Sequence, residues 1–112
     1  MAKDLESIQN IVTNYVRKIS AQIPLVKVIL FGSYAKGTYD NDSDIDLAIF
    51  SEYFEGMKGV DAFKFLFMQT LEYDVDLEPL AFTSADYNEP VGIVEEILRT
   101  GIEIPLPHVF VA

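Results

Sequence analysis

The chain has 112 residues, half of them hydrophobic, and its 18 acidic against eight basic residues give a formal net charge of −10. This composition excludes disorder and predicts one domain, residues 1–112, around a single modest core, while the acidity argues against direct binding to a nucleic-acid backbone or an anionic membrane. The absence of cysteine excludes disulfides and thiolate sites, and the lack of a secretory signal or membrane-length apolar run leads us to expect a cytoplasmic protein.

The first predicted element is a helix over residues 4–21, because apolar residues recur there at three- and four-residue spacing. The resulting stripe consists of Leu5, Ile8, Val12, Tyr15, Val16 and Ile19. Arg17 and Lys18 suit the negative C-terminal end of the helix dipole. Pro24 prevents the helix from continuing.

Residues 30–50, LFGSYAKGTYDNDSDIDLAIF, contain the most informative pattern in the chain. The apolar, β-branched run over 25–31 predicts a strand buried on both faces. Gly32 allows a ligand to approach the backbone closely, and Ser33 can cap a short helical turn that Gly37 ends. A serine at this point can also offer its hydroxyl and nearby N–H groups to a phosphate. The alternative is an ordinary strand-to-helix turn.

The second predicted strand, over residues 44–50, carries two carboxylates in an otherwise apolar run. Alternation places Asp44, Asp46 and Ala48 on one face and the intervening aliphatic residues on the other. Two carboxylates on one face repel each other and resist burial, and a bound cation relieves both costs. The alternative is that this end of the strand is exposed to solvent.

A helix is predicted over residues 60–73, on the basis of its length. Phe63, Leu66, Phe67 and Leu71 make one face, while other apolar side chains point elsewhere. The segment is therefore either a deeply packed helix or a partner interface.

The third predicted strand, over residues 75–82, offers another carboxylate. Asp74, Asp76 and Glu78 fall on one face if the strand is regular, and Pro79 indicates an edge strand or a bulge. Asp76 is the preferred third carboxylate because it lies between two apolar residues, but Asp74 and Glu78 compete with it. Three carboxylates that converge from neighbouring strands can hold two Mg²⁺ ions and position an in-line displacement at phosphorus.

The last elements complete an expected α/β fold, a small mixed β-sheet with packed helices. After a loop over residues 83–89, a helix is predicted over 90–100, with Pro90 at its first position and Gly101 at its C-terminal cap. A short strand over 102–104 and an extended Pro-containing tail over 105–112 follow.

Together these elements resemble a known family. A strand, Gly32-Ser33, ten intervening residues, Asp44-Ile45-Asp46 and a later apolar-Asp-apolar at Asp76 are similar to the nucleotidyltransferase superfamily related to DNA polymerase beta. The short chain resembles its minimal nucleotidyltransferase branch. The resemblance covers the whole chain in element order, whereas the specific motif covers residues 30–50 and 75–77.

The resemblance implies a role for each motif residue. Gly32 and Ser33 would bind the triphosphate, and Lys36 could assist them, although a solvated lysine at a helix end is an equal reading. The carboxylates that would coordinate two Mg²⁺ ions are Asp44, Asp46 and Asp76. The acceptor oxygen, activated beside Asp76, would attack the α-phosphate of ATP and release pyrophosphate.

The resemblance also implies a protein partner. Such minimal proteins are often antitoxins paired with an all-helical HEPN ribonuclease, and they transfer AMP to a toxin tyrosine. Residues 63–68 and the tail over 105–111 are where we expect this partner, or a second copy of the chain, to dock. The alternatives are a module that neutralises its partner by contact, with little or no catalysis, and a transferase that acts on a small molecule.

Overall fold

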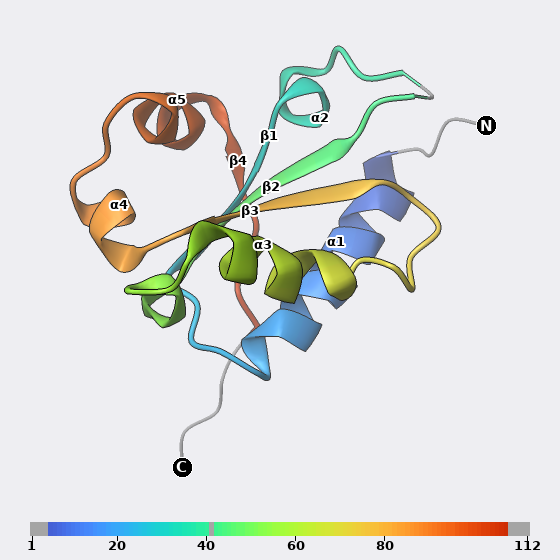
Figure 1. Ribbon diagram of the computed structural model, residues 1–112. Helices are drawn as coiled ribbons and strands as arrows, with labels where there is room; N and C mark the ends of the chain where they lie inside the picture. The colour runs from blue at the N-terminus through green and yellow to red at the C-terminus, as the bar shows by residue number, and fades with distance from the viewer. Residues whose placement is uncertain (1–4, 41, 108–112) are drawn as a thin grey trace.

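The computed structural model describes residues 5–40 and 42–107, and its helices pack around a four-stranded sheet (Figure 1). The strands are β1 (Lys27–Phe31), β2 (Ile45–Phe50), β3 (Leu77–Phe82) and β4 (Ile102–Glu103). Their order in the sheet is β3-β2-β1-β4. Strand β1 is antiparallel to β2 and β4, whereas β2 and β3 are parallel, so the predicted mixed sheet is confirmed.

Helices cover both faces of the sheet. They are α1 (Leu5–Ser20), α2 (Ser33–Lys36), α3 (Gly59–Met68), α4 (Ser84–Asn88) and α5 (Ile93–Thr100), with a 3₁₀ turn η1 (Glu52–Phe54). Figure 1 shows α1 and α3 on one face and α4 and α5 towards the other. None of the helices in the described ranges is long and apolar enough to cross a membrane.

The larger core lies between the sheet and helices α1 and α3. Every member of the predicted α1 stripe whose side chain is described is buried, and Tyr15 is fully so. Val28 and Leu30 of β1 pack into this core, while Ile29 packs into the smaller core under α5. The prediction that the first strand is buried on both faces is therefore confirmed, although β1 begins at Lys27 rather than at residue 25.

Strand β2 shows the predicted alternation. Its aliphatic residues Ile45, Leu47 and Ile49 join the larger core. Ala48 and Phe50 join the smaller core with Val94 and Ile97 of α5. Because side chains alternate along a strand, Asp46 lies on the α5 face. The carboxylate pair thus occupies the end of a strand whose remaining residues are buried.

Helix α3 is shorter than predicted, because it ends at Met68 rather than near residue 73. Helix α1 supplies hydrogen-bond donors to its C-terminal carbonyls. The Tyr15 hydroxyl donates to the Leu66 carbonyl at 2.8 Å, and Lys18 Nζ donates to the Gln69 carbonyl at 2.7 Å. These contacts satisfy groups that a helix end leaves without intrahelical partners.

The residues predicted to share one apolar face of α3 differ in burial. Leu66 is fully buried, together with Ala62, but Phe63 is 46% exposed and Phe67 is 37% exposed. The two phenylalanine rings instead stack on each other, with their centroids 5.2 Å apart. One side of α3 packs on the sheet, and the adjacent side presents aromatic rings to solvent.

The segment between β3 and β4 also differs from the prediction. The expected loop over 83–89 contains α4, which begins with a capping box. Thr83 Oγ1 accepts from the Asp86 N–H at 3.1 Å, and Asp86 Oδ2 accepts from the Thr83 N–H at 2.9 Å. Helix α5 begins at Ile93 rather than at Pro90, because Gly92 adopts φ +58° and interrupts the helix before it.

Candidate active site

Asp44 and Asp46 stand at the start of β2, directly after an ordered polar loop. Asp46 is the second residue of the strand, and both side chains are half-buried. Asp40 organises the loop, since its Oδ1 accepts from the Asp42 N–H at 2.9 Å and its own N–H donates to Ser43 Oγ at 2.9 Å. β2 follows this turn, so both carboxylates lie at the edge of the sheet where β2 begins.

Gly32 lies directly against the Asp46 carboxylate. The antiparallel register places Phe31 opposite Asp46, and Gly32 is the next residue. Gly32 has φ +75°, and a Cβ built there would clash with Oδ2 of Asp46 and lie 3.2 Å from its Cγ. Only glycine adopts this backbone conformation routinely and leaves room for the carboxylate. The structure therefore brings the predicted Gly32 and Asp46 together.

Ser33 and Lys36 lie on the β1 side of the carboxylates. Ser33 is the first residue of α2, so Gly32 occupies the cap position, and the prediction that Ser33 caps the turn is off by one residue. Gly37 ends the turn in the left-handed conformation, as predicted. Lys36 is exposed and lines a pocket of about 200 Å³ together with Gly32. The three predicted phosphate-binding residues thus cluster next to Asp46.

A tyrosine pair supports this turn, and sequence reasoning did not identify it. The rings of Tyr34 on α2 and Tyr39 in the following loop stack, with their centroids 4.4 Å apart and their planes at 11°. Tyr34 is buried in the larger core, and this burial raises the pKa of its hydroxyl. The stack attaches the chain at Tyr39 to the core.

Glu78 is the acidic residue of β3, and it lies near Asp44 and Asp46. The parallel register sets it beside Asp46. Burial, and then the charges of Asp44 and Asp46, raise the pKa of Glu78. Burial raises the pKa of Asp46 as well, and the negative charge of Asp44 adds to this shift. Burial is the largest cause of both shifts, and the nearby negative charges contribute to each.

Asp76 precedes β3 and is exposed. Its carbonyl accepts from the Ile45 N–H at 2.8 Å, which sets it beside the start of β2. Asp76 lines one groove of about 390 Å³ together with Asp44 and Glu78. Asp74 lies further out along the chain, also exposed. The choice of Asp76 as the third ligand remains a prediction, with Glu78 as its nearest competitor.

The donor chemistry of this site fits Mg²⁺. Among the described residues, no three Asp, Glu, His or Cys side chains already form a cage for a metal ion. Mg²⁺ does not require one, since it is commonly held by one or two carboxylates, substrate phosphates and water. The negative charges of Asp44, Asp46 and Glu78, together with the pocket that Gly32 and Lys36 line beside them, suit a cation that arrives with a phosphate.

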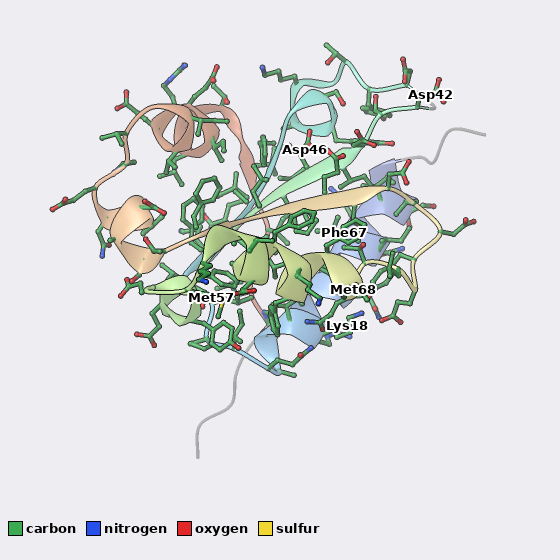
Figure 2. All side chains as sticks on the ribbon, viewed as in Figure 1. Lys18, Asp42, Asp46, Met57, Phe67 and Met68 are labelled. Carbon is green, nitrogen blue, oxygen red and sulfur yellow. The ribbon has the colours of Figure 1, made fainter. Side chains whose placement is uncertain are left out.

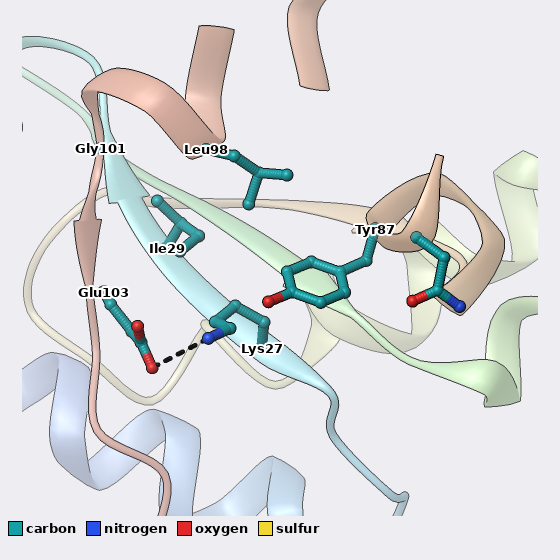
Figure 3. Close-up of a pocket in the computed structure, with 7 residues that line it drawn as sticks. Lys27, Ile29, Tyr87, Leu98, Gly101 and Glu103 are labelled. Atoms are coloured by element: carbon teal, nitrogen blue, oxygen red, sulfur yellow. Dashed lines mark ion pairs between the residues drawn. The ribbon is translucent and has the colours of Figure 1, made fainter. Parts of the chain in front are cut away.

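A second pocket, of about 530 Å³, lies at the opposite end of β1 (Figure 3). Lys27 forms an ion pair with Glu103 at 3.2 Å, and its Nζ lies 5.4 Å from the centroid of the Tyr87 ring. Hydrogen bonding to Glu103, and then to Tyr87, raises the pKa of Lys27. These contacts of Lys27 hold β4 and α4 to β1. Because Glu103 balances the charge of Lys27, this lysine is a poor phosphate ligand.

The segments expected to dock a partner are only partly described. Phe63, Phe67 and Met68 are exposed on α3, and Figure 2 labels the last two towards the C-terminal end of this helix. Residues 105–107 form no helix or strand, and the rest of the tail lies outside the described residues. An interface at either segment therefore remains a prediction.

In the strand-turn-strand unit, the Asp46 carboxylate lies against Gly32. This arrangement is typical of enzymes that act on nucleotides through acidic side chains. A family model described as nucleotidyltransferase domain matches residues 12–101. The chain belongs to this family and is a nucleotidyltransferase, so the resemblance inferred from its motifs is confirmed.

Individual relatives agree with this assignment. A Methanocaldococcus jannaschii protein, provisionally assigned as protein adenylyltransferase MJ0141, is 31% identical over 81 residues, which cover 71% of this chain and 79% of the relative. A crystal structure of a provisionally assigned nucleotidyltransferase from Sulfolobus solfataricus matches with a TM-score of 0.63 and 18% identity, over 92% of this chain and 89% of that one.

A crystal structure of a toxin-antitoxin with AMP-PNP matches with a TM-score of 0.61 and 20% identity, over 88% of this chain and 73% of that chain. At this level of identity, both solved structures establish the fold alone.

Proposed function

We propose that the chain transfers AMP from ATP to a hydroxyl group of a partner protein, in a reaction that requires Mg²⁺. The observation that carries this proposal is the contact between Asp46 and Gly32, which sets a carboxylate directly against the backbone turn between β1 and α2. The assignment of the M. jannaschii relative as a protein adenylyltransferase supports the nucleotide and the acceptor class. The AMP-PNP in the toxin-antitoxin structure supports the same nucleotide.

The β1 side of the site would bind the triphosphate. The Gly32 backbone and the Ser33 hydroxyl would contact phosphate oxygens, and exposed Lys36 would add a positive charge next to them. Asp44 and Asp46 would hold Mg²⁺ ions, which polarise the phosphoryl oxygens and neutralise the charge that develops in the transition state. A Cβ at residue 32 would clash with the Asp46 carboxylate and displace it.

The β3 side would handle the acceptor. Asp76 would ligate the metal nearer the acceptor and accept the proton of the attacking hydroxyl, with Glu78 as the alternative for this role. The new bond forms between the acceptor oxygen and the α-phosphorus, the bond from this phosphorus to the β-phosphate oxygen breaks, and pyrophosphate leaves. The partner that we propose is an all-helical HEPN-type protein, in a cytoplasmic toxin–antitoxin pair.

The test follows label from two positions of ATP. The chain and a candidate HEPN-type partner are incubated with Mg²⁺ and ATP labelled at the α- or at the γ-phosphate. The proposal requires α-label on the partner and γ-label in pyrophosphate. Label from the γ-position on protein would show phosphoryl transfer instead, and absence of α-label from the partner would contradict the proposal.

A second candidate function rests on the exposed aromatic side of α3. Phe63 and Phe67 could bind a partner and neutralise it by contact, without catalysis. The double variant Asp44→Asn, Asp46→Asn separates the two functions, because it removes metal ligands and leaves α3 unchanged. Loss of neutralisation in this variant supports catalysis, whereas full neutralisation supports contact alone.

A further inference from the structure

The groove between the C-terminal end of α3 and the start of β3 has two kinds of lining. Asp44, Asp76 and Glu78 line it on the sheet side, and Phe67 and Leu71 line it on the helix side. Phe67 is 37% exposed and Leu71 is 61% exposed. Two large apolar side chains thus stay accessible to water beside the carboxylates that the reaction uses.

We infer that this groove is the acceptor subsite, and that it takes a polypeptide segment whose hydroxyl-bearing residue is flanked by an apolar side chain. The inference rests on the proposed function and specifies the acceptor of the same site. The hydroxyl would lie at the carboxylates, and its apolar neighbour would pack against Phe67 and Leu71.

The order of the strands supports this position. Strand β2, with the carboxylate pair, lies between β1 and β3. Gly32 and Lys36 lie on the β1 side, and the groove lies on the β3 side. In an in-line displacement the attacking oxygen and the leaving oxygen occupy opposite sides of the phosphorus. If pyrophosphate leaves towards Gly32, the acceptor must approach from the groove.

The chemistry of the lining favours polypeptide over nucleic acid. No lysine, arginine or histidine is among the described residues that line the groove, and three of them are acidic. A phosphate backbone needs cationic contacts and would be repelled here. A polypeptide segment brings no such charge and can bury an apolar side chain, which gains about 25 cal/mol per Å² of apolar surface removed from water.

The test uses two short peptides of equal length, one with a tyrosine flanked by leucines and one with the tyrosine flanked by glycines. Each is titrated into the ¹⁵N-labelled full chain, and amide shifts report binding without catalysis. We expect the leucine peptide to bind about tenfold more tightly, with shifts at residues 67–78. The variant Leu71→Ser should lose most of this preference. The variant Val60→Ser, at an exposed position on the first turn of α3 outside the groove, should keep it.

The outcomes separate this inference from the proposed function. Equal binding of the two peptides, or an unchanged preference in Leu71→Ser, would overturn the acceptor subsite even if α-label from ATP still reaches protein. Displacement of the leucine peptide by a short single-stranded oligonucleotide would overturn the polypeptide assignment. A clear preference without transfer of α-label to the bound peptide would instead contradict the proposed function.

Discussion

At the scale of single residues, Gly32 is the position on which the site most depends. Its positive φ and its contact with the Asp46 carboxylate are two separate requirements for glycine. Gly37, at the other end of α2, has a similar φ of +78° but no atom within 4 Å of a built Cβ. The pair therefore allows the effect of backbone strain to be separated from the effect of the clash.

We predict that Gly32→Ala and Gly37→Ala each lower the free energy of unfolding by about 1–2 kcal/mol, the cost of placing alanine in the left-handed region. Gly32→Ala should also reduce kcat/KM by about 100-fold or more, because it displaces the Asp46 carboxylate that we propose binds the metal. Chemical denaturation and steady-state kinetics measure the two effects. Equal loss of activity in both variants would show that the contact with Asp46 has no special role.

Glu78 makes the stability of the metal-free chain depend on pH. A carboxyl group whose pKa is raised by folding binds more protons in the folded state, so stability falls as pH rises from the unfolded pKa, about 4, through the folded value. The carboxylate of Glu78 therefore opposes folding at neutral pH.

We predict that Glu78→Gln raises the melting temperature at pH 7 without Mg²⁺, and that the gain disappears towards pH 4. Thermal unfolding across this range measures it. The same change at exposed Glu89, beyond the other end of β3, is the control and should give little gain at either pH. A melting temperature that falls at pH 7 in Glu78→Gln would show that the carboxylate stabilises the fold.

The sequence predicts part of the site, for a clear reason. Asp44 and Asp46 lie in one strand predicted over residues 44–50, so period-two alternation alone puts them on one face, although β2 itself begins at Ile45. The neighbour of Asp46 on β3 depends on the register between parallel strands that are joined through α3, and local spacing does not contain this register. For the same reason the groove beside Phe67 and Leu71 could not be predicted, because it combines residues from a helix, a turn and a strand.

At the scale of secondary-structure elements, the end of α3 depends on α1. The apolar pattern of residues 60–73 continues past Met68, which explains why a longer helix is predicted from sequence. The helix stops where Tyr15 and Lys18 provide donors to the carbonyls of Leu66 and Gln69. Long-range contacts of this kind fix a boundary that local propensity leaves open.

We predict that Tyr15→Phe destabilises the chain by about 1–3 kcal/mol, because it leaves the Leu66 carbonyl without its hydroxyl donor in a buried place. Denaturant unfolding measures the loss. The control Tyr53→Phe, at a position 43% exposed, should change stability by less than about 0.5 kcal/mol. Equal stability of Tyr15→Phe and the parent chain would mean that this hydrogen bond does not help to end α3.

The elements with a strong local pattern are those that the sequence predicts well. Helix α1 has one continuous apolar stripe, and β1 and β2 are short apolar runs bounded by glycine or polar residues. Helix α4 was missed because five residues give too little periodicity, although Thr83 and Asp86 have the spacing of a capping box. The start of α5 depends on a positive φ at Gly92, which composition alone does not reveal.

At the scale of the whole molecule, the order of the sheet divides the site into two halves. The β1 side carries the glycine turn and Lys36, the β3 side carries the acidic and apolar groove, and β2 presents the carboxylates between them. A chain with a net charge of −10 repels a free nucleotide at long range, and a cation bound to the phosphates would reduce this repulsion. We therefore propose that Asp44 and Asp46 bind nucleotide through metal ions.

The most direct test of this claim replaces Mg²⁺ by Mn²⁺ and follows the free ion by electron paramagnetic resonance, as the chain is titrated with AMP-PNP. We predict that the parent chain binds about two Mn²⁺ ions with the nucleotide, and that Asp46→Asn loses most of this binding while it stays folded. If Asp46→Asn binds Mn²⁺ and nucleotide as strongly as the parent chain, this result contradicts the proposal that Asp46 holds the metal ions.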